Sequence, residues 1–282
     1  MKQTTLMMAA AAALMATNVM AAGDTPQNVA GDGTSLRAKI AKTCKVTGED
    51  VWYGYRRTKF DFKGRKAWVV EPSVAPAKGM PWTWTMQWAE AFVPRTGVPD
   101  LLGKGYHHVT IDVYNTRMDE NGLKACAAFQ DFLVKELGFA PKANLVGMSW
   151  GGFFSTRYAT TYPQNVRRIY LDAPLLNFDG FSAKAIGVWR ASTPADGKWT
   201  NDPRMPVNMA EAIAKAGIPV LLLYGGKDTV VPPPLNAELF LARFKAAGGQ
   251  IDVDKRADFG HHPHGVDTNK TSTIVNFVMS EK

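Results

Sequence analysis

The sequence predicts an α/β fold with a doubly wound, mostly parallel sheet, and three observations support this prediction. Short apolar runs typical of buried strands alternate with longer segments of helical periodicity along much of the chain. Glycine and proline separate many of these segments. The length of 282 residues, with 46% hydrophobic and 21% charged residues, fits one large folded domain.

Residues 1–22 are typical of a secretory signal peptide. Lys2 precedes an apolar run over residues 6–15, and cleavage is expected after Ala21 or Ala22. The alternative is a membrane anchor, but this run is too short to span a bilayer, and no later segment approaches about 20 uninterrupted apolar residues. We therefore expect a periplasmic or secreted protein with no stable membrane association after cleavage.

The first predicted element of the sheet is a β-hairpin over residues 56–73. Lys63 and Gly64 supply a turn between two segments rich in apolar residues. Residues 23–57 before it are polar and are interpreted as a linker and lead-in, so the predicted domain covers residues 58–282.

Strand and helix signals then alternate as far as the C-terminus. The predicted strands cover residues 107–114, 144–148, 167–174, 217–225 and 250–257, and the predicted helices cover residues 122–137, 151–163, 232–249 and 271–279. Alternation of this kind places helices on both faces of a mainly parallel sheet. Residues 175–207 are too long for an ordinary connection, so we expect a short lid insertion there, after the sixth strand.

Charge and cysteine content restrict the partners. The formal net charge of +8 becomes +7 when Lys2 is removed, since 32 basic and 25 acidic residues remain. A basic balance can favour anionic substrates or simply aid solubility. The basic residues are scattered and form no nucleic-acid-binding motif, so we expect no nucleic-acid partner. Cys44 and Cys126 could pair in an oxidising compartment or remain free thiols, and the sequence leaves both open.

A Gly-x-Ser-x-Gly pentapeptide lies between a predicted strand and a predicted helix, in the stretch ANLVGMSWGG. Gly147 and Gly151 remove side chains where strand and helix approach, which leaves the hydroxyl of Ser149 exposed at the helix N-terminus. The N–H of Trp150 at that terminus could stabilise a developing oxyanion. The pattern predicts a nucleophilic serine; the alternative is a tight turn that happens to contain serine.

Two further polar segments follow predicted strands. Asp228 lies in YGGKDTVVPP and His261 in GHHPHG. Ligands bind at the carboxyl ends of the strands in such a sheet, so both side chains are expected beside Ser149. There an imidazole would take the serine proton, and the carboxylate would orient the imidazole.

Alternatives remain for these two segments. Asp228 could be an ordinary turn or helix-capping aspartate, and Asp172, which also ends a strand, is the second candidate acid. His262 is the second candidate base. Clustered histidines near Asp258 could hold zinc, but adjacent histidines usually point apart, so we expect no metal.

With its serine, aspartate and histidine in this order, each after a strand, the chain from residue 58 onward resembles the α/β-hydrolase superfamily. More narrowly, it is similar to exported bacterial hydrolases of the prolyl-oligopeptidase-like and carbohydrate-esterase branches. The resemblance implies a serine hydrolase that forms an acyl-enzyme and requires no cofactor. It also implies a second oxyanion donor in the loop after the third strand, where the N–H of Trp82 is the candidate.

The substrate is predicted less sharply than the chemistry. Several tryptophans fall in segments expected near one cleft, and Trp189 and Tyr114 are our candidate substrate-binding residues. We expect a carboxylic ester on a small molecule or a glycan. The alternatives are a non-catalytic carbohydrate-binding protein of the same fold and a small serine peptidase. The sequence leaves the acyl group, the alcohol and the oligomeric state open. His107 and His108 precede a strand away from this edge and are expected to be structural.

Overall fold

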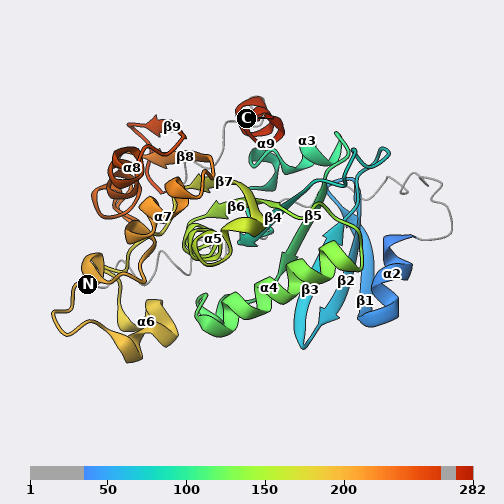
Figure 1. The fold of residues 1–282 in the computed structure, drawn as a ribbon, viewed down its shortest axis with the longest axis horizontal. Helices are drawn as coiled ribbons and strands as arrows, with labels where there is room; N and C mark the ends of the chain where they lie inside the picture. Colours follow the sequence, from blue (N-terminus) through green and yellow to red (C-terminus); the bar gives the residue numbers. More distant parts are fainter. Residues whose placement is uncertain (1–34, 262–270, 282) are drawn as a thin grey trace.

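The computed structural model describes residues 35–261 and 271–281, which are built around one nine-stranded sheet of order β1-β2-β3-β5-β4-β6-β7-β8-β9 (Figure 1). The strands are β1 (Lys45–Trp52), β2 (Tyr55–Phe62), β3 (Arg65–Val70), β4 (Trp82–Gln87), β5 (His107–Ile111), β6 (Ala143–Met148), β7 (Val166–Asp172), β8 (Val220–Gly225) and β9 (Ile251–Arg256). Pairing is antiparallel from β1 through β3 to β5 and parallel from β5 to β9. The carboxyl ends of the parallel strands therefore share one edge, as the predicted fold class requires.

Helices cover both faces of this sheet, which confirms the doubly wound arrangement (Figure 1). One face carries α2 (Leu36–Thr43), α4 (Glu120–Lys135), α5 (Trp150–Thr161), α7 (Ala210–Lys215) and α8 (Ala237–Ala246), and the other carries α3 (Val98–Leu102) and α9 (Ser272–Met279). The alternation of strand side chains divides the core accordingly. Leu222 and Tyr224 of β8 pack on the first side, and Leu221 and Leu223 pack on the second.

The predicted hairpin is present as β2 and β3. Lys63 and Gly64 both have left-handed backbone conformations, with φ of 53° and 81°. A two-residue turn with positive φ at both positions matches the twist of antiparallel strands. The antiparallel edge of the sheet therefore begins where the sequence indicates.

The structure contains elements that were not predicted, among them α2, β1 and β4. Residues 23–57 were interpreted as a lead-in, but α2 and β1 lie within them, so the boundary predicted at residue 58 is too late. β1 is an edge strand whose residues alternate between exposed and half-buried, so charged side chains obscure its apolar pattern. β4 occupies part of the segment that the sequence assigns to a loop.

The predicted lid insertion is present and follows the seventh strand of the sheet, β7, rather than the sixth; β1 and β4 were not among the predicted strands. It contains α6 (Ala183–Ile186) and the 3-10 turns η5 (Gly187–Ser192), η6 (Trp199–Asn201) and η7 (Pro206–Asn208). Other short 3-10 turns are η2 (Val93–Arg95), η3 (Tyr114–Thr116), η4 (Pro163–Asn165) and η8 (Pro233–Leu235).

Several sequence predictions concern residues other than the catalytic candidates. Residues 1–22, predicted as a signal peptide, lie outside the described residues, and no helix within the described ranges has the length and apolarity needed to cross a membrane. Cys44 and Cys126 are both free thiols, the first half-buried and the second buried. His107 and His108 lie buried in β5, and burial lowers the pKa of His107 to about 4 and that of His108 to about 3.

Candidate active site

Ser149 lies on a sharp turn between β6 and α5. Its backbone has φ 51° and ψ −117°, a conformation that is costly for a residue with a side chain. The surrounding backbone holds it there, because Ser149 N–H donates to the Asp172 carbonyl at 2.9 Å. The Ser149 carbonyl in turn accepts from the N–H groups of Gly152 and Leu175, each at 2.9 Å.

The glycines of the pentapeptide are required by close backbone contacts. A Cβ on Gly151 would lie 2.2 Å from the carbonyl oxygen of Gln87, at the end of β4. A Cβ on Gly147 would lie 2.8 Å from the carbonyl oxygen of Gly151. The start of helix α5 therefore lies against β4 and β6 so closely that neither glycine could carry a side chain.

His261 connects the serine hydroxyl to a carboxylate. Its Nε2 lies 3.1 Å from Ser149 Oγ, and its Nδ1 lies 2.8 Å from Asp228 Oδ2. The other carboxylate oxygen accepts hydrogen bonds from the N–H groups of Val230 and Val231 at 2.8 and 2.9 Å. An ionised carboxylate can only accept, so Nδ1 carries the proton and Nε2 can accept one from the serine.

The loops that carry Asp228 and His261 lie backbone against backbone. A Cβ on Gly225 would lie 2.1 Å from the carbonyl oxygen of Gly260, and a Cβ on Gly226 would lie 2.6 Å from that of Ala257. Lys227 N–H also donates to the Phe259 carbonyl at 2.9 Å. The glycine pair before the acid thus lets the histidine loop approach, a role that the sequence analysis did not assign.

The alternatives for acid and base have different outcomes. Asp172 is fully buried, accepts a hydrogen bond from the Tyr170 hydroxyl and supports the turn of Ser149 through its carbonyl. It is Asp228, not Asp172, whose carboxylate contacts the imidazole of His261. His262 and His264 lie outside the described residues, and the zinc alternative that depends on them stays untested. No group of three metal-ligating side chains occurs among the residues that are described.

Trp150 and Trp82, the two predicted oxyanion donors, lie at opposite ends of the parallel strands. Trp150 is the first residue of α5, so its N–H has no acceptor within the helix and lies beside Ser149. Trp82 is the first residue of β4, and its neighbour Thr83 pairs with Asn144 at the amino end of β6. The prediction for Trp82 is wrong, because its backbone is most of a strand length away from Ser149.

Trp88 follows the carboxyl end of β4, at the same edge of the sheet as Ser149, and is therefore the candidate for the second oxyanion donor. Gln87 pairs with Gly147 and contacts the elbow, and Trp88 follows it directly. The sequence contained a signal for this position of the loop. Apolar and polar residues alternate in WTWTMQ, residues 82–87, as they do in a strand, so the loop after the strand is expected from residue 88.

Aromatic side chains and one arginine adjoin the elbow. The half-buried ring of Tyr114 lies 4.9 Å from the Trp88 ring and 6.2 Å from the Trp150 ring, measured between centroids. The Arg117 guanidinium carbon lies 3.7 Å from the centroid of the Tyr114 ring. Tyr114 therefore lies beside the candidate site, and its contact with substrate stays a prediction.

Trp189 is buried inside the insertion, which corrects its predicted substrate-binding role. It is 5% exposed, and its indole N–H donates to the Arg117 carbonyl at 2.9 Å. Its ring packs against Phe153, Phe178 and Trp199. Both the ring surface and the polar atom are thus engaged within the protein, so Trp189 anchors the insertion to α5.

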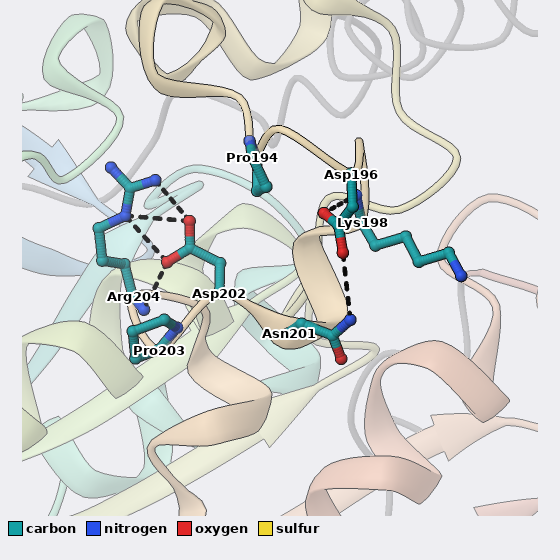
Figure 2. Close-up of a pocket in the computed structure, with 7 residues that line it drawn as sticks. All are labelled: Pro194, Asp196, Lys198, Asn201, Asp202, Pro203 and Arg204. Carbon is teal, nitrogen blue, oxygen red and sulfur yellow. Dashed lines mark hydrogen bonds and ion pairs between the residues drawn. The ribbon is translucent and has the colours of Figure 1, made fainter.

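An open pocket of about 420 Å³ lies on the surface of the insertion (Figure 2). Its polar side chains bind one another: Asp202 pairs with Arg204, and Asp196 accepts from the side chain of Asn201. None of the residues that line it belongs to the Ser149, His261 and Asp228 group. The candidate site is therefore defined by the hydrogen-bonded side chains at the sheet edge rather than by this pocket.

Comparison with known proteins gives the same fold. A family model described as the alpha/beta hydrolase fold matches residues 83–197. The chain is 28% identical over 124 residues to a Salmonella typhimurium protein named "Putative carboxymethylenebutenolidase", an alignment that covers 44% of this chain and 37% of that protein.

Solved structures of two peptidases resemble the chain more extensively. Dipeptidyl peptidase 4 of Porphyromonas gingivalis is 14% identical, with a TM-score of 0.58 over 82% of this chain and 36% of that one. The acylaminoacyl peptidase of Pyrococcus horikoshii is 15% identical, with a TM-score of 0.54 over 86% of this chain and 42% of that one. The chain thus spans less than half the length of each of these three proteins, and the structural likenesses concern the fold.

Proposed function

Because this chain has the α/β-hydrolase fold, we propose that it is a serine hydrolase that cleaves carboxylic esters through Ser149, His261 and Asp228. The observation that carries the proposal is the continuous chain of hydrogen-bond contacts from the Ser149 hydroxyl through the imidazole to a buried carboxylate. A nucleophile, a base and a group that orients the base are the parts that acyl transfer requires.

In the proposed mechanism, Ser149 Oγ attacks the ester carbonyl while His261 Nε2 accepts the hydroxyl proton. Asp228 stabilises the imidazolium that forms. The N–H groups of Trp150 and Trp88 stabilise the oxyanion of the tetrahedral intermediate. The imidazolium then gives its proton to the departing alcohol. In the second half of the reaction the same imidazole accepts a proton from water, which attacks and hydrolyses the acyl-enzyme. No step uses a cofactor.

The substrate class rests on weaker support than the chemistry. The relative named "Putative carboxymethylenebutenolidase" favours an ester. Sugar stacking on tryptophan favours a glycan ester, but most tryptophans of the segments expected near the cleft are buried: Trp82, Trp84, Trp150, Trp189 and Trp199. Trp88 is partly exposed. We propose a small-molecule ester as the substrate, with a glycan ester as the second candidate. We also propose that the protein is exported.

Comparison of the wild type with Ser149→Ala tests the proposal. The mature protein is incubated with p-nitrophenyl acetate and, separately, with a fluorophosphonate probe. We expect turnover and labelling by the wild type and neither by Ser149→Ala, because the nucleophile is lost. Ser272→Ala is the matched control, since Ser272 is an exposed serine at the start of α9.

Each other outcome excludes a specific hypothesis. Equal activity of wild type and Ser149→Ala would show that the serine mechanism is wrong. Absence of turnover with any ester, together with glycan binding that survives triad substitution, would support the non-catalytic alternative. Cleavage of peptide anilides in preference to esters would favour the peptidase.

A further inference from the structure

The segment after β4 carries a carboxylate, Glu90, that has no part in the triad. The chain turns directly after the strand, because Ala91 N–H donates to the Trp88 carbonyl at 2.9 Å. Glu90 lies inside this turn, two residues after Trp88. Glu90 and the proposed second oxyanion donor therefore belong to the same short turn.

Two donors from the antiparallel edge of the sheet hold this carboxylate. Trp52, the last residue of β1, donates its indole N–H to Glu90 Oε2 at 2.7 Å. Arg57 of β2 donates Nη1–H to Glu90 Oε1. Since each oxygen has its own donor, the carboxylate cannot rotate without breaking a contact. Its side chain is 54% exposed, and an ion pair at that exposure adds little to stability by itself.

Both donors are fixed by their own surroundings. Trp52 is 3% exposed, and its ring stacks on His108 with centroids 5.5 Å apart. The Arg57 guanidinium lies 5.3 Å from the Trp68 ring centroid. Its Nε and Nη2 groups donate to the two oxygens of Asp50 at 2.8 and 2.7 Å. Glu90 is thus attached to a packed, hydrogen-bonded anchor that does not have to be ordered during the reaction.

We propose that Glu90 is a positioning residue of the oxyanion hole, which links the Trp88 N–H to the anchor formed by Trp52 and Arg57. An oxyanion donor is effective only when its N–H is already directed to the place where the charge develops. The anchor supplies this orientation from strands that contribute no group to the triad. The proposal rests on the proposed function, because it assigns a role in the same reaction.

The expected kinetic signature is a fall in kcat with little change in KM. Removal of a whole oxyanion donor costs about 10²- to 10³-fold in kcat, so loss of its positioning in Glu90→Ala should cost about tenfold. KM for p-nitrophenyl acetate should stay within about twofold, because the ground-state ester carries no oxyanion. A trifluoromethyl ketone, whose adduct has such an oxyanion, should bind about tenfold more weakly.

Conservative variants separate positioning from simple packing. Glu90→Gln keeps one oxygen acceptor and should recover most of the kcat lost in Glu90→Ala. Trp52→Phe keeps the ring but removes the indole N–H, and should give a smaller loss with the same signature. In the double variant the two effects should not add, because both act through one contact. Asp131→Ala, which removes an exposed carboxylate paired with Lys135 on α4, is the matched control.

The outcome distinguishes this proposal from the function on which it rests. If Ser149→Ala is inactive but Glu90→Ala keeps wild-type kcat and inhibitor affinity, the positioning role is wrong and the serine mechanism stands. The positioning role is equally wrong if the loss of kcat in Glu90→Ala only matches the fraction of unfolded protein and the folded protein keeps its affinity for the inhibitor. If Ser149→Ala is as active as the wild type, the proposed function itself fails.

Discussion

Replacing Asp228 with asparagine tests the orientation of His261 with almost no change in shape. Asp228 Oδ1 accepts two backbone N–H bonds, so the amide oxygen of the asparagine must occupy that position. The amide NH₂ then points at His261 Nδ1, which must accept a hydrogen bond instead of donating one. The imidazole proton moves to Nε2, and Nε2 can no longer accept the proton of Ser149.

The size of the effect follows from this tautomer. The opposite amide orientation would leave the part-buried N–H of Val230 and the buried N–H of Val231 facing another donor, at about 1–3 kcal/mol for each unsatisfied buried group. The unproductive tautomer is therefore strongly favoured, and we expect kcat to fall about 10⁴-fold, as in a serine protease triad with the same substitution. This corresponds to between 5 and 6 kcal/mol at about 1.4 kcal/mol for each factor of ten. Stability should change little, because the hydrogen-bond contacts are kept.

The assay compares p-nitrophenyl acetate turnover, fluorophosphonate labelling rate and melting temperature. Asp258→Asn is the control, because Asp258 is an exposed carboxylate near the same loop, paired with Lys227 at 2.7 Å. It should retain activity within about twofold, as expected for an exposed ion pair. Retention of more than a tenth of wild-type kcat by Asp228→Asn would refute the reasoning.

Three other results are expected. Gly151→Ala should lower the free energy of unfolding in urea by at least about 2 kcal/mol and should also lower kcat, because its Cβ would lie 2.2 Å from the Gln87 carbonyl oxygen. Gly48→Ala is the control: its Cβ has nothing within 4 Å, so both quantities should change much less. Acidification should destabilise the protein: the buried His107 and His108 have pKa values of about 4 and about 3, so below pH 6.5 the unfolded chain binds more protons. The free energy of unfolding should fall by about 4 kcal/mol between pH 7 and 5, and a flat profile would contradict this. Exhaustive chelation should leave ester turnover unchanged, because protein groups supply every step; loss of turnover would favour the metal alternative.

The segments of the proposed triad could be located from the sequence because each follows a predicted strand of a parallel sheet. Ser149, Asp228 and His261 come from segments whose strands all end at one edge, so chain order and local pattern suffice to bring them near one another. Their hydrogen-bond contacts could not be predicted in this way. These depend on how the glycine pair before Asp228 lets the histidine loop approach, which is a property of two distant backbones.

The error at Trp82 has a local origin. Proline and glycine at positions 76, 79 and 81 indicate a loop, but Pro81 lies immediately before a strand, a position that proline tolerates. The alternating residues of β4 are buried on both faces, so the polar threonines do not mark a solvent side. The residue that follows the strand, and with it the candidate oxyanion donor, is therefore Trp88, six residues later than the predicted Trp82.

Aromatic residues show most clearly what a single sequence leaves undetermined. Trp189 and Trp88 are chemically identical, yet one is enclosed by the insertion and the other is half-exposed beside the elbow. The difference depends on partners far along the chain, such as the Arg117 carbonyl that accepts the Trp189 indole N–H. Composition can therefore suggest a stacking surface, but only tertiary contacts decide which rings are available to a substrate. For this site they reduce the argument for sugar recognition to one indole, which also belongs to the segment that Glu90 holds in place.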